Sequence, residues 1–228
     1  MFMRKLIFIA LFVIIAGTPF LAVHTTYAQT GGTNVVVDSV PQNSMLNSVI
    51  DRVFSSWPWY LARGAGLVAA GILVILMLSG VGFITGHSFS ILEPITAWAT
   101  HRALGIALGI AVLIHVVALY FDTFVPFNLK ELLVPFASEY QPLYVALGIF
   151  ALYVLAAIVL TSLFWVDSKP KTWKLIHLFS YLVLALVFVH ALYLGTDLMH
   201  GVLRWLWVGG FILLTAASFV RLRRANTV

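Results

Sequence analysis

Cysteine is absent from this chain of 228 residues, and charged residues are scarce. Without a thiol, the chain forms no disulfide and offers no ligand for a cysteine-bound iron–sulfur cluster or a covalently attached c-type haem. Only 9% of the residues are charged, whereas 62% are hydrophobic, and the mean hydropathy is +1.04. This composition lies far outside that of soluble globular domains and predicts an integral membrane protein.

Apolar runs of membrane length fill most of the chain. They predict an all-α membrane protein, a bundle of five transmembrane helices at 60–83, 98–121, 142–166, 173–196 and 204–220. Residues 1–28 begin with basic residues and continue in an apolar stretch, which is typical of a signal peptide or of a sixth, N-terminal helix. We expect residues 29–56 to form an extracytoplasmic tail and residues 57–224 to form the membrane domain. The short amphipathic piece 128–136 is expected to lie on the membrane surface.

The net charge of +5 indicates topology rather than nucleic-acid binding, because the basic residues stand at the ends of the apolar runs. One side of the bundle carries four basic and six acidic residues. The other side has Glu93 and Asp167 against seven basic residues: Arg102, Lys169, Lys171, Lys174, Arg221, Arg223 and Arg224. This bias predicts a multi-pass protein of the cytoplasmic (inner) membrane, in contact with lipid, with its C-terminus in the cytoplasm.

Two of the apolar runs carry two histidines each: His101 and His115 in one, and His177 and His190 in the other. Ionisable side chains inside a bilayer are costly and usually functional. The two runs are separated by one span, so they cross the membrane in the same direction. Depth therefore pairs His101 with His177, and His115 with His190. At 1.5 Å per residue the two levels are roughly 20 Å apart, which is most of the ~30 Å hydrocarbon core.

Neutral imidazole is a good axial ligand for haem iron, and an iron held by two histidines has no open position. Any redox cofactor of this cysteine-free chain must be held by histidine. We therefore expect two b-type haems, one at each level, and electron transfer rather than dioxygen binding. Gly105 and Gly109 lie between His101 and His115 and leave room for a macrocycle.

Three cations are placed to meet haem propionates: Arg102, Lys174 and Arg63. Ordinary anchoring at the membrane interface by snorkelling explains the same three residues equally well.

One spacing conflicts with this pairing. Fourteen residues separate His101 from His115, which returns to within about 40° of the same helix face. Thirteen residues separate His177 from His190, which leaves the second ring about 140° from the first on a straight helix. A tilted crossing or a local distortion of 173–196 would resolve the conflict.

Other readings of the histidines fit the sequence less well. A zinc site is disfavoured because no tightly spaced histidine pair and no Cys or Glu accompanies them in the spans. A proton or metal transporter commonly shows internal repeats and broken helices, and we find no clear repeat. A haem-binding relay subunit without a substrate of its own is the nearest alternative.

Two segments carry a family resemblance: THRALGIALGIAVLIHVVALYFD and WKLIHLFSYLVLALVFVHALYLGTD. They resemble the third and fifth spans of the ferric-reductase-like transmembrane domain, and the resemblance covers about 57–224. That domain is shared by ferric reductases, NADPH oxidases and the haem-binding membrane subunit of a bacterial periplasmic methionine sulfoxide reductase. The thirteen-residue interval is also similar to the pattern of the NADPH oxidase branch.

The resemblance implies that His101, His115, His177 and His190 hold two b-type haems, and that electrons move from the cytoplasmic side outward. Ferric reductases and NADPH oxidases continue into a flavin- and nicotinamide-binding domain. Here no G-x-G-x-x-G follows a strand pattern, and we expect no flavin or nicotinamide site in this chain. A separate reductase or a membrane quinol is the expected donor. Ferric iron or a periplasmic partner protein is the expected acceptor.

Overall fold

The computed structural model describes residues 42–85 and 93–224. By its internal contacts the chain divides into two compact units, Met1–Ser55 and Ser56–Val228. Within the described residues every regular element is helical, in agreement with the all-α prediction. The predicted signal peptide, and the part of the predicted tail before residue 42, lie outside the described residues.

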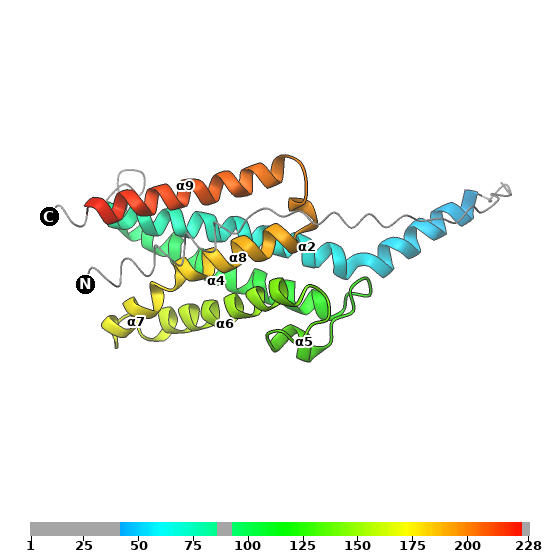
Figure 1. Ribbon diagram of the computed structural model, residues 1–228, viewed down its shortest axis with the longest axis horizontal. Coiled ribbons are helices and arrows are strands. Elements are labelled where there is room, and N and C mark those ends of the chain that lie inside the picture. The colour runs from blue at the N-terminus through cyan, green and yellow to red at the C-terminus, as the bar shows by residue number, and fades with distance from the viewer. Residues whose placement is uncertain (1–41, 86–92, 225–228) are drawn as a thin grey trace. The chain divides into compact units, whose positions relative to one another are not determined.

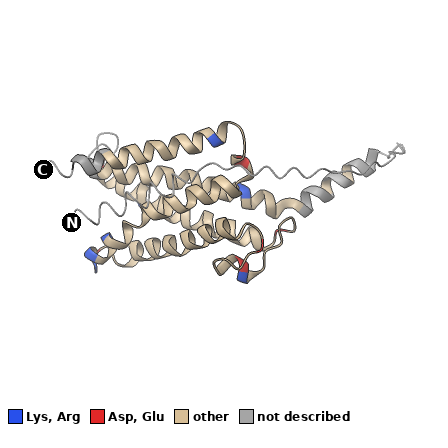
Figure 2. Ribbon diagram, in the orientation of Figure 1, with Lys and Arg blue, Asp and Glu red and all other residues tan. Residues whose placement is uncertain are grey.

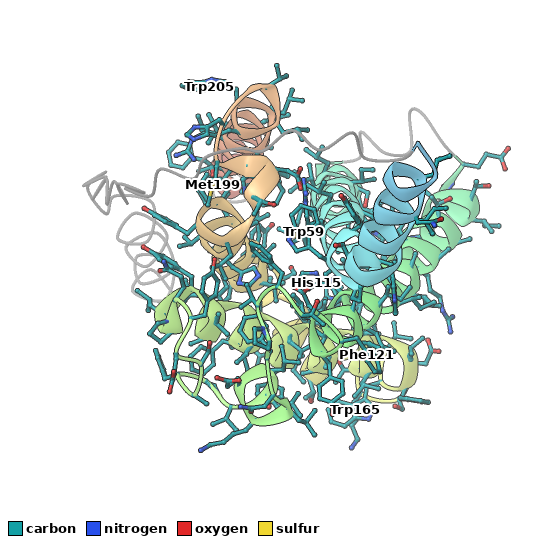
Figure 3. All side chains as sticks on the ribbon, turned by 90° about the vertical axis from the view of Figure 1, so that its right-hand side faces the viewer. Trp59, His115, Phe121, Trp165, Met199 and Trp205 are labelled. Atoms are coloured by element: carbon teal, nitrogen blue, oxygen red, sulfur yellow. The ribbon has the colours of Figure 1, made fainter. Side chains whose placement is uncertain are left out.

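Within residues 42–85 and 93–224, five helices are long and apolar enough to cross a membrane. Figure 1 shows them side by side, and Figure 3 shows them nearly end-on. The spans are Ser56–Phe83, Pro94–Tyr120, Pro142–Phe164, Pro170–Leu194 and Val202–Phe219. The expected bundle of five transmembrane helices is therefore confirmed. Each of the second, third and fourth spans begins at a proline, whose missing N–H costs nothing in the first turn of a helix.

The first span belongs to a longer helix than the sequence predicted. Helix α2 runs through Gln42–Thr85, although we expected a helix only from residue 60. The extension has a sequence signal, because Leu46, Val49, Ile50 and Val53 repeat at helical spacing. Pro58 lies within α2 and did not end it.

Three helices form the closely packed centre of the larger unit. Helix α6 (Pro142–Phe164) packs most extensively on α8 (Ser180–Leu194), and also contacts α4 (Pro94–Tyr120). Helix α2 reaches α4 through side chains, as where the Phe83 ring stacks on Trp98 with 4.7 Å between centroids. Helix α9 (Val202–Arg224) contacts α8 and the short η1 (Thr196–Leu198) that precedes it.

The loop after α4 contains α5 (Leu129–Leu133), which begins at Asn128. The Asn128 side chain accepts a hydrogen bond from the Glu131 N–H, and the Glu131 side chain accepts one from the Asn128 N–H. This reciprocal cap explains why so short a helix forms. Whether it lies on the membrane surface stays a prediction.

Charged side chains of the described residues gather towards the two ends of the bundle (Figure 2). At one end are the exposed lysines around α7 (Pro170–His177). At the other end the coloured residues lie around α5, η1 and the start of α9, where Arg63 pairs with Asp197 and Arg204 donates to the Leu198 carbonyl. This distribution is what a membrane-spanning bundle requires, because isolated charges in the hydrocarbon core are costly.

Candidate haem-binding site

His101 on α4 and His177 at the end of α7 face each other. Their ring centroids are 6.3 Å apart and their planes differ by 51°. A first-row metal ion binds an imidazole nitrogen at roughly 2 Å, so two rings on opposite sides of one ion have centroids roughly 6 Å apart. The spacing of this pair, called the His101 level below, therefore suits one shared ion.

The other two histidines that depth pairs are His115 on α4 and His190 on α8. This second pair is called the His115 level. Both rings are half-buried, and Figure 3 shows His115 among the helices, whereas the exposed Trp205 lies at the periphery.

Both rings of the His115 level are oriented by main-chain carbonyls. The His115 Nδ1 lies 2.8 Å from the Ala62 carbonyl oxygen on α2, and the His190 Nδ1 lies 2.8 Å from the Tyr144 carbonyl oxygen on α6. A carbonyl oxygen only accepts, so each Nδ1 carries the proton and donates it. Each Nε2 is then left with a lone pair for a metal ion.

A glycine stands one helical turn after each of these carbonyls. A Cβ built on Gly66, four residues after Ala62, would lie 3.1 Å from the His115 Nδ1. A Cβ on Gly148, four residues after Tyr144, would lie 2.5 Å from the His190 Cε1. Because glycine has no Cβ, each ring can lie flat on the helix and reach the carbonyl beneath it.

The rings of the His101 level are oriented by serine hydroxyls. The His101 Nδ1 lies 2.7 Å from the Ser79 Oγ, and that hydroxyl donates to the Leu76 carbonyl oxygen at 2.9 Å. Since the hydroxyl proton is used there, the Ser79 oxygen accepts from His101. Across the site, the His177 Nδ1 lies 3.4 Å from the Ser162 Oγ, and that oxygen accepts from the Trp173 Nε1–H at 3.0 Å.

The predicted helix 173–196 is two helices, α7 and α8, with a tight turn directly after His177. The Phe179 N–H bonds to the Ile176 carbonyl at 3.0 Å, and the Tyr181 N–H bonds to the Leu178 carbonyl at 3.3 Å. These i→i−3 bonds are typical of a 3₁₀ turn, which rotates the chain by about 120° per residue instead of about 100°. The extra rotation reduces the 140° offset between His177 and His190 that a straight helix would give.

The predicted propionate-binding cations have different surroundings. Arg102 and Lys174 are exposed next to the His101 level. Arg63 donates from Nε to the Asp197 Oδ2 at 3.0 Å and from Nη2 to Oδ1, and its guanidinium lies 4.0 Å from the centre of the Trp59 ring. Asp197 is thus a partner that the sequence did not reveal. Propionate binding by the three cations stays a prediction.

The Arg63–Asp197 pair yields a stability prediction. Hydrogen bonds from Arg63 hold the pKa of Asp197 below its ordinary value. Asp197→Asn should therefore lower the free energy of unfolding by about 1 kcal/mol or less near neutral pH, since the pair is partly solvated. The wild-type advantage should disappear as the pH falls through the lowered pKa, because both proteins then carry a neutral side chain.

Thermal unfolding in detergent, near neutral pH and in acid, measures this difference. Asp167→Asn, at an exposed position, is the control. A difference that persists unchanged in acid would contradict the ion-pair account.

The residues present suit a haem in their donor set and in their space. The rings of His101 and His177 approach each other, those of His115 and His190 each keep Nε2 available, and a Cβ built on Gly105 or Gly109 would meet nothing within 4 Å. Among residues 42–85 and 93–224 no group of three or more His, Cys, Asp or Glu gathers around a common point. Paired ligands are the arrangement that bis-histidine haem needs, because the macrocycle supplies the other donors.

Comparison with known families agrees with this reading. The family of ferric reductase like transmembrane components matches residues 65–189. The chain belongs to this family. The matched region contains His101, His115 and His177, and ends one residue before His190. Searches of curated proteins and of solved structures give no match. A transmembrane domain of this family suggests electron transfer across the membrane.

Proposed function

We propose that this protein transfers electrons across the membrane through two b-type haems, one held by His101 and His177, the other by His115 and His190. The observation that carries the proposal is the set of four hydrogen-bonded Nδ1 atoms. Each partner lies on a different helix from its histidine and orients the ring so that Nε2 remains available to a metal ion. Packing of the helices alone does not require four histidines, each oriented by a contact from a second helix.

The chain's own residues explain why electron transfer is favoured over other haem chemistry. The haems supply a reversible one-electron change at iron. With His101 and His177 holding one iron and His115 and His190 the other, no ligand position would remain for dioxygen. Arg102 and Lys174 at the His101 level would offer positive charge to propionates, as would Arg63 at the other level, where it also pairs with Asp197.

The charge bias of the ends sets the proposed direction. The exposed lysines of α7 mark the side that we assign to the cytoplasm, next to the His101 level. Electrons enter there from a separate reductase or a membrane quinol. They leave from the His115 level to ferric iron or to an extracytoplasmic partner protein. The protein would then act in the cytoplasmic membrane.

A vesicle assay tests the proposal. Purified protein is reconstituted in vesicles that contain ferricyanide, and dithionite is added outside. We expect the trapped ferricyanide to be reduced faster than in protein-free vesicles, and His190→Ala to abolish the difference. Haem-containing protein that becomes reduced but leaves the trapped ferricyanide oxidised would contradict transmembrane transfer.

The same assay separates a ferric reductase from a relay subunit. Vesicles filled with a ferric chelate replace those filled with ferricyanide. Reduction of both acceptors supports a protein that reduces iron itself. Reduction of ferricyanide without the ferric chelate supports a relay that serves a partner enzyme. A histidine-based transporter would give neither reduction.

A further inference from the structure

The two histidine levels differ in one respect that the ligand set does not explain. At the His115 level both rings donate to main-chain carbonyls, at 2.8 Å each. At the His101 level both rings contact serine hydroxyls, at 2.7 Å and 3.4 Å. A main-chain carbonyl cannot be removed by substitution, whereas a serine hydroxyl can.

We propose that Ser79 and Ser162 are positioning residues that set the reduction potential of the His101 level independently of the His115 level. The proposal rests on the function proposed above. A hydrogen bond from Nδ1–H to an acceptor makes the Nε2 lone pair a stronger donor. A stronger axial donor stabilises ferric over ferrous iron, which lowers the potential, so axial-ligand hydrogen bonding is one of the protein's controls over haem potential.

The two serines differ in how well they accept. The Ser79 hydroxyl proton is directed to the Leu76 carbonyl, so the oxygen accepts the His101 Nδ1–H, at a short distance of 2.7 Å. The Ser162 oxygen receives the Trp173 Nε1–H as well, and its distance to His177 is longer. The Ser162 oxygen serves two donors, and the longer distance marks the bond to His177 as the weaker of the two. By bonding to Ser162, Trp173 therefore makes the His177 Nε2 lone pair a weaker electron donor to iron.

This arrangement predicts shifts of opposite sign. Ser79→Ala and Ser162→Ala remove the acceptor and should move the midpoint potential of the His101 level to more positive values, with the larger shift for Ser79→Ala. Trp173→Phe leaves Ser162 to His177 alone and should move the same midpoint to more negative values. The midpoint of the His115 level should stay unchanged in all three variants.

Potentiometric titration of the haem absorbance measures both midpoints. Repeating it in a His190→Ala background leaves one haem and assigns the shifted midpoint to the His101 level. Ser79→Thr retains the hydroxyl and should restore the wild-type midpoint. Ser218→Ala is the matched control, because the Ser218 hydroxyl also donates to a carbonyl of its own helix, at 2.7 Å on α9.

The outcomes separate the two proposals. Haem retained, with both midpoints equal to those of the Ser218→Ala control in both serine variants, overturns the role of the serines and leaves the proposed function standing. If Ser79→Ala loses the haem, Ser162→Ala and Trp173→Phe decide, and shifts of the same sign from these two overturn the proposal. Folded wild-type protein without haem overturns the proposed function, and this inference with it.

Discussion

Replacement of His190 by alanine is expected to reduce the haem content from two per chain to one, and His115→Ala should do the same. Each variant removes one axial imidazole from the His115 level, while the pair His101 and His177 keeps its 6.3 Å ring spacing. The two levels are roughly 20 Å apart along the helices, so loss of one should leave the other intact. Haem quantification on purified protein measures the change.

The control for this experiment is His200→Ala, at an exposed position after η1. It should retain both haems. Unchanged haem content in both His115→Ala and His190→Ala would reject the pairing of these two residues. Loss of both haems in a variant that remains folded would show that the levels are not independent.

Gly148→Ala should remove the same haem without touching a ligand. Its Cβ would lie 2.5 Å from the His190 Cε1 and 2.6 Å from Nδ1, well inside van der Waals contact. The imidazole ring must move away and would lose its bond to the Tyr144 carbonyl, which orients Nε2. Because a side chain rather than the backbone yields, the helix should remain folded.

A graded glycine series tests this steric argument. Gly66→Ala brings a Cβ to 3.1 Å from the His115 Nδ1 and should give a partial loss of the same haem. Gly71→Ala meets nothing within 4 Å and is the matched control, with both haems retained. Equal haem content in Gly148→Ala and Gly71→Ala would show that the close approach of His190 to α6 has no role in haem binding.

The sequence predicted the spans well because bilayer length and hydropathy dictate them. All five expected spans are present, one of them as the two helices α7 and α8, and the starts shift by only a few residues where proline opens a helix, as at Pro94 and Pro170. The depth of the four histidines followed from the same counting. The approach of His101 to His177 agrees with it.

Features set by tertiary contacts could not be read from the sequence. Ser79 and Ser162 are small polar residues within apolar helices, and such a residue can equally bond to its own helix. In the sequence nothing distinguishes Gly148 from other glycines of the spans; its importance comes from the packing of His190 on it. The turn after His177 had an indirect signal, since a straight helix misplaces one of the two rings, but its position came from the structure.

The most direct test of the account is a reduced-minus-oxidised optical spectrum with haem quantification on wild-type protein purified in detergent. The account predicts two b-type haems per chain, both six-coordinate through histidine. One haem would leave a relay but break the two-level arrangement of His101 with His177 and His115 with His190. Folded protein that was made with haem available and contains none would contradict the account.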